Sequence, residues 1–448
     1  MAKKILAASF LWLISISFVY GIPQTSPASL SLEDKILGFM TVYAEVKYNF
    51  IFADRLKDWD EKASLIVPQI LSAPDVASYY NLLKRWVGTL GNGHTLVHAP
   101  NTYWDSFNMP PVECAVIGDR VYISRVGRRE DIVRQAVRPG LEILEVEREP
   151  ALKHFENSIL PLCSFSRKET AFRRYSMWLL AGPRDKPARF RVTGNREIVL
   201  RRDTKEDTGG YFIRKQDDPF HHNLENRFIN GILYVNLASF GVDPAVLSGQ
   251  FDEILKKNTL DKLYGIVLDL RDNGGGNDEA AFGIAQRFLS KPVPGAKSRI
   301  RKYSGARKAW GNGDEWEDLE PSEILPAREG TPRFHGPLVL LTGPETASAA
   351  EDFAMVLQKS GRAVLVGERT AGDTGQIISF GLPQGGILWV LTKWDFFPDG
   401  RELIGVGIQP DIELRPTIKE IISGEDPVLE KAVSIIINKD HDRKNRVE

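Results

Sequence analysis

Apolar residues recur at helical spacing near the start of the chain. From about residue 32 to residue 90 they lie three or four positions apart, as in the pair Ile36 and Met40 and the later pair Tyr79 and Leu83. This period places the apolar side chains on one face of a helix. The pattern therefore predicts a helical N-terminal domain over residues 30–98.

The helical pattern ends at residues 90–95, which read Leu-Gly-Asn-Gly-His-Thr. Two glycines and an asparagine stop a helix, and a β-type run follows them. His94 is therefore expected on a loop at a helix-to-strand corner. A zinc-binding helix carrying His94 and His98 is not expected, because the residues between them are of strand type and no glutamate follows His94.

Short β-type runs dominate the middle of the chain and predict a small β-rich domain over residues 105–205. The sequence Arg-Pro-Gly at residues 138–140 forms a turn between two of the runs. Such a turn resembles that of a PDZ domain, whose edge strand binds an extended peptide, while an unrelated β module is the alternative. A polar linker follows at residues 203–218. The runs are residues 112–117, 121–126, 143–146, 188–192 and 197–200.

Strands and helices alternate beyond residue 220. A strand at 232–235, a helix at about 246–257 and a strand at 265–270 follow one another. This order predicts a largely parallel sheet with helices on its faces, and the domain is assigned to residues 220–437. Its last expected elements are strands at 388–391 and 408–414 that complete the core, a closing helix at 428–437, and then a charged tail at 438–448.

An insertion rich in proline, glycine and charge interrupts this domain at residues 291–329. Its basic residues, such as Lys297 and Arg299, come first, and its acidic residues, such as Glu317 and Asp318, come after. A solvated loop is the simpler interpretation. A lid over an active site is the alternative.

The first residues show a different hydrophobic pattern. Lys3 and Lys4 precede an apolar run at residues 5–20, which is typical of a secretory signal peptide, here assigned to residues 1–21. The run is shorter than the roughly 20 residues that span a bilayer, so an uncleaved anchor is the weaker alternative. We expect a periplasmic or secreted protein with no stable membrane span after signal removal.

Composition and charge exclude several classes of protein. The chain has 448 residues, 42% of them hydrophobic, with 58 Lys+Arg against 59 Asp+Glu. These values exclude a disordered or collagen-like chain, and a formal net charge of -1 gives no sign of a nucleic-acid partner. The two cysteines, Cys114 and Cys163, could pair or remain buried thiols.

Two strand-to-helix turns carry candidate chemistry. The first is the sequence Arg-Asp-Asn-Gly-Gly-Gly-Asn at residues 271–277, whose glycines leave backbone N–H groups uncovered at a helix N-terminus and so favour an anion. It lacks the spacing of a dinucleotide-binding or phosphate-binding loop, and a simple tight turn is the alternative. The second turn holds Ser348, where an exposed nucleophile is expected. There, Ser348 and Glu351 also fit a capping box, a structural alternative.

Taken together, the turns are part of four ordered motifs that resemble the S41 family of serine peptidases, which includes tail-specific and tricorn-type proteases. The resemblance implies an α/β multidomain fold: a helical N-terminal segment, a PDZ-like β domain and an S41-type catalytic core of the ClpP/crotonase-like type. It also implies a polypeptide substrate and neither a cofactor nor a metal. The motifs are residues 269–276, 346–351, 367–372 and 405–411.

The resemblance implies a role for each matching residue. Ser348 is the implied nucleophile, and the amides of Ala349 and Gly275 are the implied oxyanion hole. Tail-specific members place a lysine base 25 residues after the serine, but that position here is Asp373. The tricorn-like version uses a histidine base upstream of the PDZ-like domain, and His94 lies where that pattern expects it.

Two positions depart from the tricorn-like pattern. That pattern orients the histidine with a serine just before it and a glutamate just before the last motif, and here those positions are Gly93 and Ile404. Three residues remain open as the orienting group: Asn92, Glu368 and Glu402. We therefore predict an extracytoplasmic serine endopeptidase that acts on unfolded or extended polypeptides. The alternatives are a weakly active or inactive binding protein for peptides or small apolar ligands, and a hydrolase of other esters.

Overall fold

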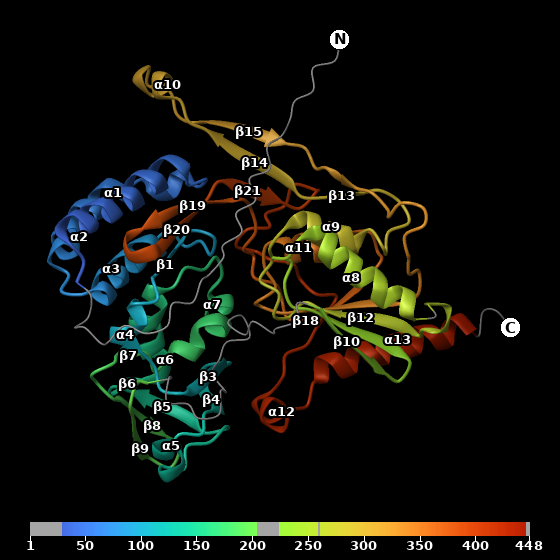
Figure 1. Ribbon diagram of the computed structural model, residues 1–448, viewed down its shortest axis with the longest axis horizontal. Coiled ribbons are helices and arrows are strands. Elements are labelled where there is room, and N and C mark those ends of the chain that lie inside the picture. Colours follow the sequence, from blue (N-terminus) through green and yellow to red (C-terminus); the bar gives the residue numbers. More distant parts are fainter. Residues whose placement is uncertain (1–28, 204–223, 259, 445–448) are drawn as a thin grey trace.

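The computed structural model describes residues 29–203, 224–258 and 260–444 (Figure 1). The predicted signal peptide and most of the predicted polar linker therefore lie outside the described residues. Within these three ranges, no helix is both long enough and apolar enough to cross a bilayer.

A six-stranded sheet forms the core of the C-terminal half. Its strand order is β10-β11-β12-β17-β18-β22, and every neighbouring pair is parallel except β10 with β11. The predicted α/β class with a largely parallel sheet is thus confirmed. The strands are β10 (Leu224–Ile229), β11 (Ile232–Leu237), β12 (Gly265–Asp269), β17 (Leu338–Thr342), β18 (Val364–Gly367) and β22 (Ile412–Glu413).

Helices cover both faces of this sheet, which explains why β12 and β17 are apolar at nearly every position. Leu268 and Leu340 point into a cluster with the helices of one face, while the adjacent Val267 and Val339 point to the other. In Figure 1, α8, α9 and α11 lie on one side of the sheet and α13 lies on the other. The helices are α8 (Pro244–Lys257), α9 (Asp278–Ala285), α11 (Ala349–Lys359) and α13 (Pro427–Lys444).

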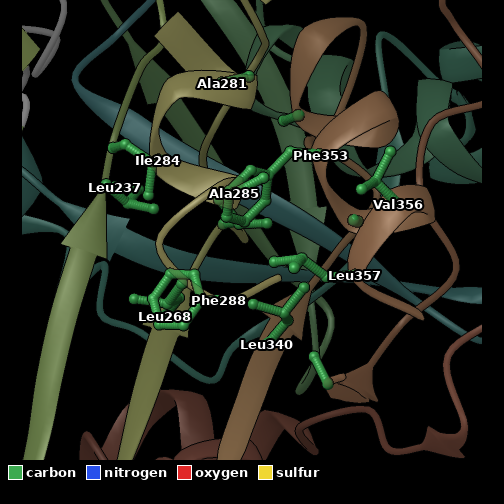
Figure 2. Packing of buried hydrophobic residues seen from close by; sticks show 14 of the residues in the cluster. Leu237, Leu268, Ala281, Ile284, Ala285, Phe288, Leu340, Phe353, Val356 and Leu357 are labelled. Atoms are coloured by element: carbon green, nitrogen blue, oxygen red, sulfur yellow. The ribbon is translucent and has the colours of Figure 1, made fainter. Parts of the chain in front are cut away.

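Phe353 of α11 lies at the centre of the larger cluster. Its ring is fully buried and lies 5.4 Å from that of Phe240, centroid to centroid. Figure 2 shows it between the helical residues Ile284 and Val356 and above the strand residue Leu340. This packing attaches α11, and with it the turn that precedes α11, to the sheet.

The N-terminal region is built from three helices that pack on a small sheet. That sheet has the order β1-β20-β19 and is separate from the core sheet. The prediction that the strand near residue 388 completes the catalytic core is therefore wrong: Leu388 and Val390 of β20 are buried among the N-terminal helices instead. The elements are α1 (Leu32–Asn49), α2 (Trp59–Ser72), α3 (Val76–Gly88), β1 (Leu96–His98), β19 (Ile377–Leu382) and β20 (Gly386–Leu391).

The β-rich region contains all five predicted strands, each starting at most one residue earlier than expected. They form one sheet in the order β3-β4-β5-β8-β9, and α7 (Lys168–Tyr175) lies between β5 and β8 along the chain. Cys114 and Cys163 are both buried free thiols, so the structure contains no disulfide between them. The strands are β3 (Val112–Ile117), β4 (Arg120–Val126), β5 (Glu142–Val146), β8 (Ala188–Val192) and β9 (Arg196–Leu200).

The insertion predicted as a solvated loop is instead largely a hairpin of β14 (Lys297–Lys302) and β15 (Glu315–Leu319) that projects from the molecule in Figure 1. The charge order has a physical reason, since the basic strand pairs with the acidic one: Arg299 contacts Asp318 at 2.5 Å, and Lys302 contacts Glu317 at 2.7 Å. β14 also pairs with β21 (Lys393–Phe396), which anchors the hairpin to the segment after β20.

Replacing Phe353 tests how strongly the core holds α11. We expect Phe353→Ala to lower the free energy of unfolding by about 3–5 kcal/mol, because it removes buried area and leaves a cavity. Phe228→Ala is the matched control, since Phe228 lies on β10 and is 55% exposed, and its cost should stay below about 1 kcal/mol. Denaturant unfolding followed by circular dichroism gives both values. Equal losses in the two variants would contradict the packing described.

Candidate active site

Ser348 lies at the turn between β17 and α11 in an unusual backbone conformation. Its φ is 55° and its ψ is −130°, a region that costs a non-glycine residue roughly 1–3 kcal/mol and that persists only where neighbouring contacts enforce it. The Ser348 side chain accepts no capping hydrogen bond from α11. The capping-box alternative is therefore wrong, because the Glu351 carboxylate binds a different segment.

Hydrogen bonds join the two strand-to-helix turns. The Thr346 hydroxyl donates to the Leu270 carbonyl at 2.7 Å, and the Ala347 amide donates to the Asn273 carbonyl at 3.1 Å. These bonds link the end of β17 to the end of β12, its parallel neighbour in the sheet. The glycine turn and the serine turn therefore form one unit.

Gly275 makes the closest approach between the turns. Its φ is 100°, and a Cβ built on it would lie 2.6 Å from the Ser348 Cβ and 2.7 Å from the Ala347 carbonyl oxygen. Only glycine fits such a position. The Gly275 N–H donates to Asn273 Oδ1 at 2.8 Å, whereas Ala349 is the first residue of α11 and its N–H has no acceptor within the helix.

His94 lies on the corner between α3 and β1, as the sequence predicted for this segment. The Gly93 N–H before it is close to two acceptors, Ser166 Oγ at 3.1 Å and Asp373 Oδ1 at 3.2 Å. The His94 N–H donates to Asn92 Oδ1 at 3.1 Å. The Nδ1 atom of His94 is buried, and no described residue forms a hydrogen bond with it.

The loop at residues 370–374 brings the Ser348 turn and the His94 corner together. The Ser348 N–H donates to the Asp373 carbonyl at 2.7 Å, while the carboxylate of the same Asp373 accepts from Gly93. The β-rich region reaches this loop as well, because the Arg167 guanidinium donates to the Thr370 carbonyl. All three regions of the chain therefore meet at one loop.

The side chain of Glu351 anchors this loop through hydrogen bonds. Its carboxylate accepts hydrogen bonds from the Thr370 hydroxyl and from the amides of Gly372 and Asp373, each amide at 2.9 Å. Burial raises the pKa of Glu351 to about 7, although these three bonds act in the opposite direction.

Burial also determines the charge of His94. Desolvation lowers the pKa of His94 below its usual value; the Asp373 and Asp395 carboxylates oppose this shift, and the Arg174 guanidinium adds to it. The imidazole is therefore neutral near pH 7, the form that can accept a proton. Arg174 in turn contacts Glu345 at 3.3 Å and Asp373 Oδ2 at 3.7 Å.

The three candidates for the orienting group form contacts that do not involve the His94 ring. Glu402 is exposed and accepts from Trp394 Nε1 at 2.9 Å, and Glu368 accepts from the Arg415 guanidinium at 2.5 Å. Asn92 contacts the backbone of His94 rather than its ring. The carboxylate that the structure brings to the corner is Asp373, which the sequence singled out only as the position where tail-specific proteases have lysine.

Comparisons with known proteins find a match to one family over part of the chain. Residues 231–414 match peptidase family S41. A carboxy-terminal-processing protease of Bartonella bacilliformis is 29% identical over 183 residues, which cover 41% of this chain and 38% of that protein. The chloroplastic carboxyl-terminal-processing peptidase 3 of Arabidopsis thaliana is 24% identical over 410 residues, covering 87% of this chain and 72% of that protein. The match thus spans well under half of the Bartonella protein.

A solved structure shares the fold. Mature CPAF complexed with lactacystin aligns with 90% of this chain and 98% of its own, with a TM-score of 0.64 and 14% sequence identity. At this identity the similarity concerns the fold alone. It extends beyond the core sheet to the N-terminal helices and the β-rich region.

The close approach of Gly275 to Ser348 predicts a steric effect. We expect Gly275→Ala to lower the free energy of unfolding by about 2–5 kcal/mol, because the new Cβ overlaps the Ser348 turn and the backbone is left-handed. Gly274→Ala is the matched control, since a Cβ at Gly274 meets nothing within 4 Å. Denaturant unfolding of both variants measures the difference, and equal stability would show that the two turns are not in contact.

The buried Glu351 predicts a pH dependence of stability. Its folded pKa of about 7 lies above the usual 4.5, so the folded state binds the proton more tightly and this group's contribution to stability falls as the pH rises from about 4.5 to about 7. We expect the parent to lose about 2–3 kcal/mol more than Glu351→Gln between about pH 5 and pH 8. Chemical unfolding at the two pH values tests this. Identical pH dependence in both proteins would contradict it.

Proposed function

This chain carries a peptidase family S41 domain over residues 231–414, and on that premise we propose that it is a serine-type peptidase acting on extended polypeptides. The members of this family are serine-type hydrolases. One observation supports the proposal above the others: the strained Ser348 turn lies against the glycine turn and is joined through Asp373 to the corner that carries His94.

The proposed reaction starts at Ser348. His94, which is neutral near pH 7, accepts the proton of the Ser348 hydroxyl while the Ser348 Oγ bonds to the carbonyl carbon of the substrate. The amide nitrogen then leaves with the proton from His94, and an acyl group stays on Ser348. Water, deprotonated by His94, hydrolyses this ester and regenerates the serine.

The negative oxygen of the tetrahedral intermediate needs hydrogen-bond donors. We assign this role to the amides of Ala349 and Gly275, which flank Ser348. The Ala349 N–H has no acceptor within α11, whereas the Gly275 N–H would have to exchange Asn273 Oδ1 for the oxyanion. A charged oxygen is the stronger acceptor of the two, which favours this exchange.

The neighbouring regions supply the proposed substrate path. The β-rich region, which we interpret as PDZ-like, contacts the loop at residues 370–374 through Arg167 and through the Thr170 hydroxyl, 3.3 Å from the Ala371 carbonyl. A polypeptide held on this region would therefore be close to Ser348. The signal-like residues 1–21 support a location outside the cytoplasm.

A fluorophosphonate probe tests the proposed nucleophile and its base. We expect the parent to be labelled and to degrade denatured casein, and both Ser348→Ala and His94→Ala to lose the labelling and at least about 10³-fold in rate. His335→Ala is the control, since that histidine is exposed and has no place in the site. Melting temperatures verify that each variant is folded.

The outcomes separate the two functional classes. Unchanged degradation by Ser348→Ala would overturn the peptidase assignment. An unlabelled and inactive parent would instead favour a binding protein on this fold, whose affinity for peptides or small apolar ligands should not depend on the Ser348 hydroxyl.

A further inference from the structure

Two complementary polar atoms near Ser348 are buried without a hydrogen-bond partner. They are His94 Nδ1, which can carry a proton, and Asp373 Oδ2, which can accept one; no described residue bonds either atom. A buried polar group without a partner costs about 1–3 kcal/mol, so such atoms rarely persist without a role. A bond between the two atoms would satisfy both.

The backbone places Asp373 next to the histidine corner. Asp373 is 1% exposed, and its Oδ1 lies 3.2 Å from the amide nitrogen of Gly93, the residue before His94. Its own amide is bound by Glu351 at 2.9 Å, and its carbonyl is bound by Ser348 at 2.7 Å. The backbone of Asp373 is therefore anchored to the Ser348 turn, and its carboxylate is bonded to the residue before His94.

Gly93 provides the space for this carboxylate. A Cβ at Gly93 would lie 2.2–2.4 Å from the carboxylate carbon and both carboxylate oxygens of Asp373. The Asp373 side chain thus occupies the volume that any other residue at position 93 would fill. This contact accounts for the glycine directly before His94.

We propose that Asp373 is the positioning residue of the site: its carboxylate accepts a hydrogen bond from His94 Nδ1–H, and this bond keeps the lone pair of Nε2 directed at Ser348. The proposal rests on the proposed peptidase function. It assigns Asp373 a role through His94, without contact to the substrate.

The charged groups around His94 agree with this assignment. Asp373, Asp395 and Arg174 all act on the imidazole, and Asp373 is the carboxylate with the largest effect. Asp395 already accepts from the Ser298 hydroxyl at 2.6 Å and contacts Lys393 at 3.2 Å. Arg174 lies 3.7 Å from Asp373 Oδ2, which is too long for a direct hydrogen bond and leaves that oxygen available.

The test compares Asp373→Asn with Glu402→Gln in the full chain, following kcat/KM for denatured casein against pH. We expect Asp373→Asn to lose about 10²–10⁴-fold in kcat/KM through kcat, because asparagine no longer fixes the tautomer of His94. The acid limb of its pH profile should also move to lower pH, since a negative charge next to the imidazole is gone. Glu402→Gln should match the parent in rate and profile.

A second measurement uses the parent and so does not depend on the folding of a variant. A strongly deshielded imidazole N–H proton should appear in the proton NMR spectrum and disappear in His94→Ala. Its absence would overturn the proposal, as would a folded Asp373→Asn with an unshifted profile. An inactive, unlabelled parent would instead reject the peptidase function itself, so the two failures are distinguishable.

Discussion

One buried carboxylate, that of Glu351, holds the loop on which the site depends. An ionised carboxylate is costly to bury unless it is hydrogen-bonded, and here it meets a hydroxyl and two amides that all belong to residues 370–373. Because both amide donors must point at the same side chain, they fix the backbone of the loop. The loop then presents its carbonyl to Ser348 and its carboxylate to Gly93. A shift of this loop would move Ser348, the proposed nucleophile, together with the histidine corner, and catalysis in general is sensitive to displacements of about 1 Å.

The parallel sheet supplies the rigid frame beneath this loop. β12 and β17 are neighbours with Asp269 opposite Leu341, so the turns that follow them emerge side by side at the carboxyl edge of the sheet, where open α/β sheets bind their ligands. The hydrogen bonds between the two turns, together with the bond from the Ser348 N–H to the Asp373 carbonyl, enforce the strained conformation of Ser348. The strain is thus local, and the buried packing of α11 around Phe353 keeps it in place.

Local patterns predicted much of this architecture, and long-range pairing accounts for what they missed. The five strands of the β-rich region, the βαβ units and the two turns follow from period, turn residues and composition, which are local properties. The strand with which a given strand pairs is not determined by the local sequence. β20 follows the core strands β17 and β18 along the chain, yet it pairs with β1, the strand that follows His94. The basic and acidic residues of the hairpin are likewise separated in sequence, and they form ion pairs only because β14 pairs with β15. Asp373 was missed for the same reason, since its neighbour Gly93 lies far away along the chain.

Gly93 and Asp373 are in steric contact, and each differs from one of the two S41 patterns that the sequence resembles: Gly93 from the tricorn-like pattern and Asp373 from the tail-specific one. Serine in place of Gly93 would put a Cβ within 2.4 Å of the Asp373 carboxylate, and lysine in place of Asp373 would remove an acceptor from the Gly93 amide and place an ammonium group in a site that already contains Arg174. A serine at position 93 would therefore require the Asp373 carboxylate to move. The absence of a side chain at Gly93 and the carboxylate of Asp373 therefore fit each other. Ile404 packs in the N-terminal core, so a glutamate at that position would be buried among apolar side chains, whereas the carboxylate of Asp373 already reaches the histidine corner through the Gly93 amide.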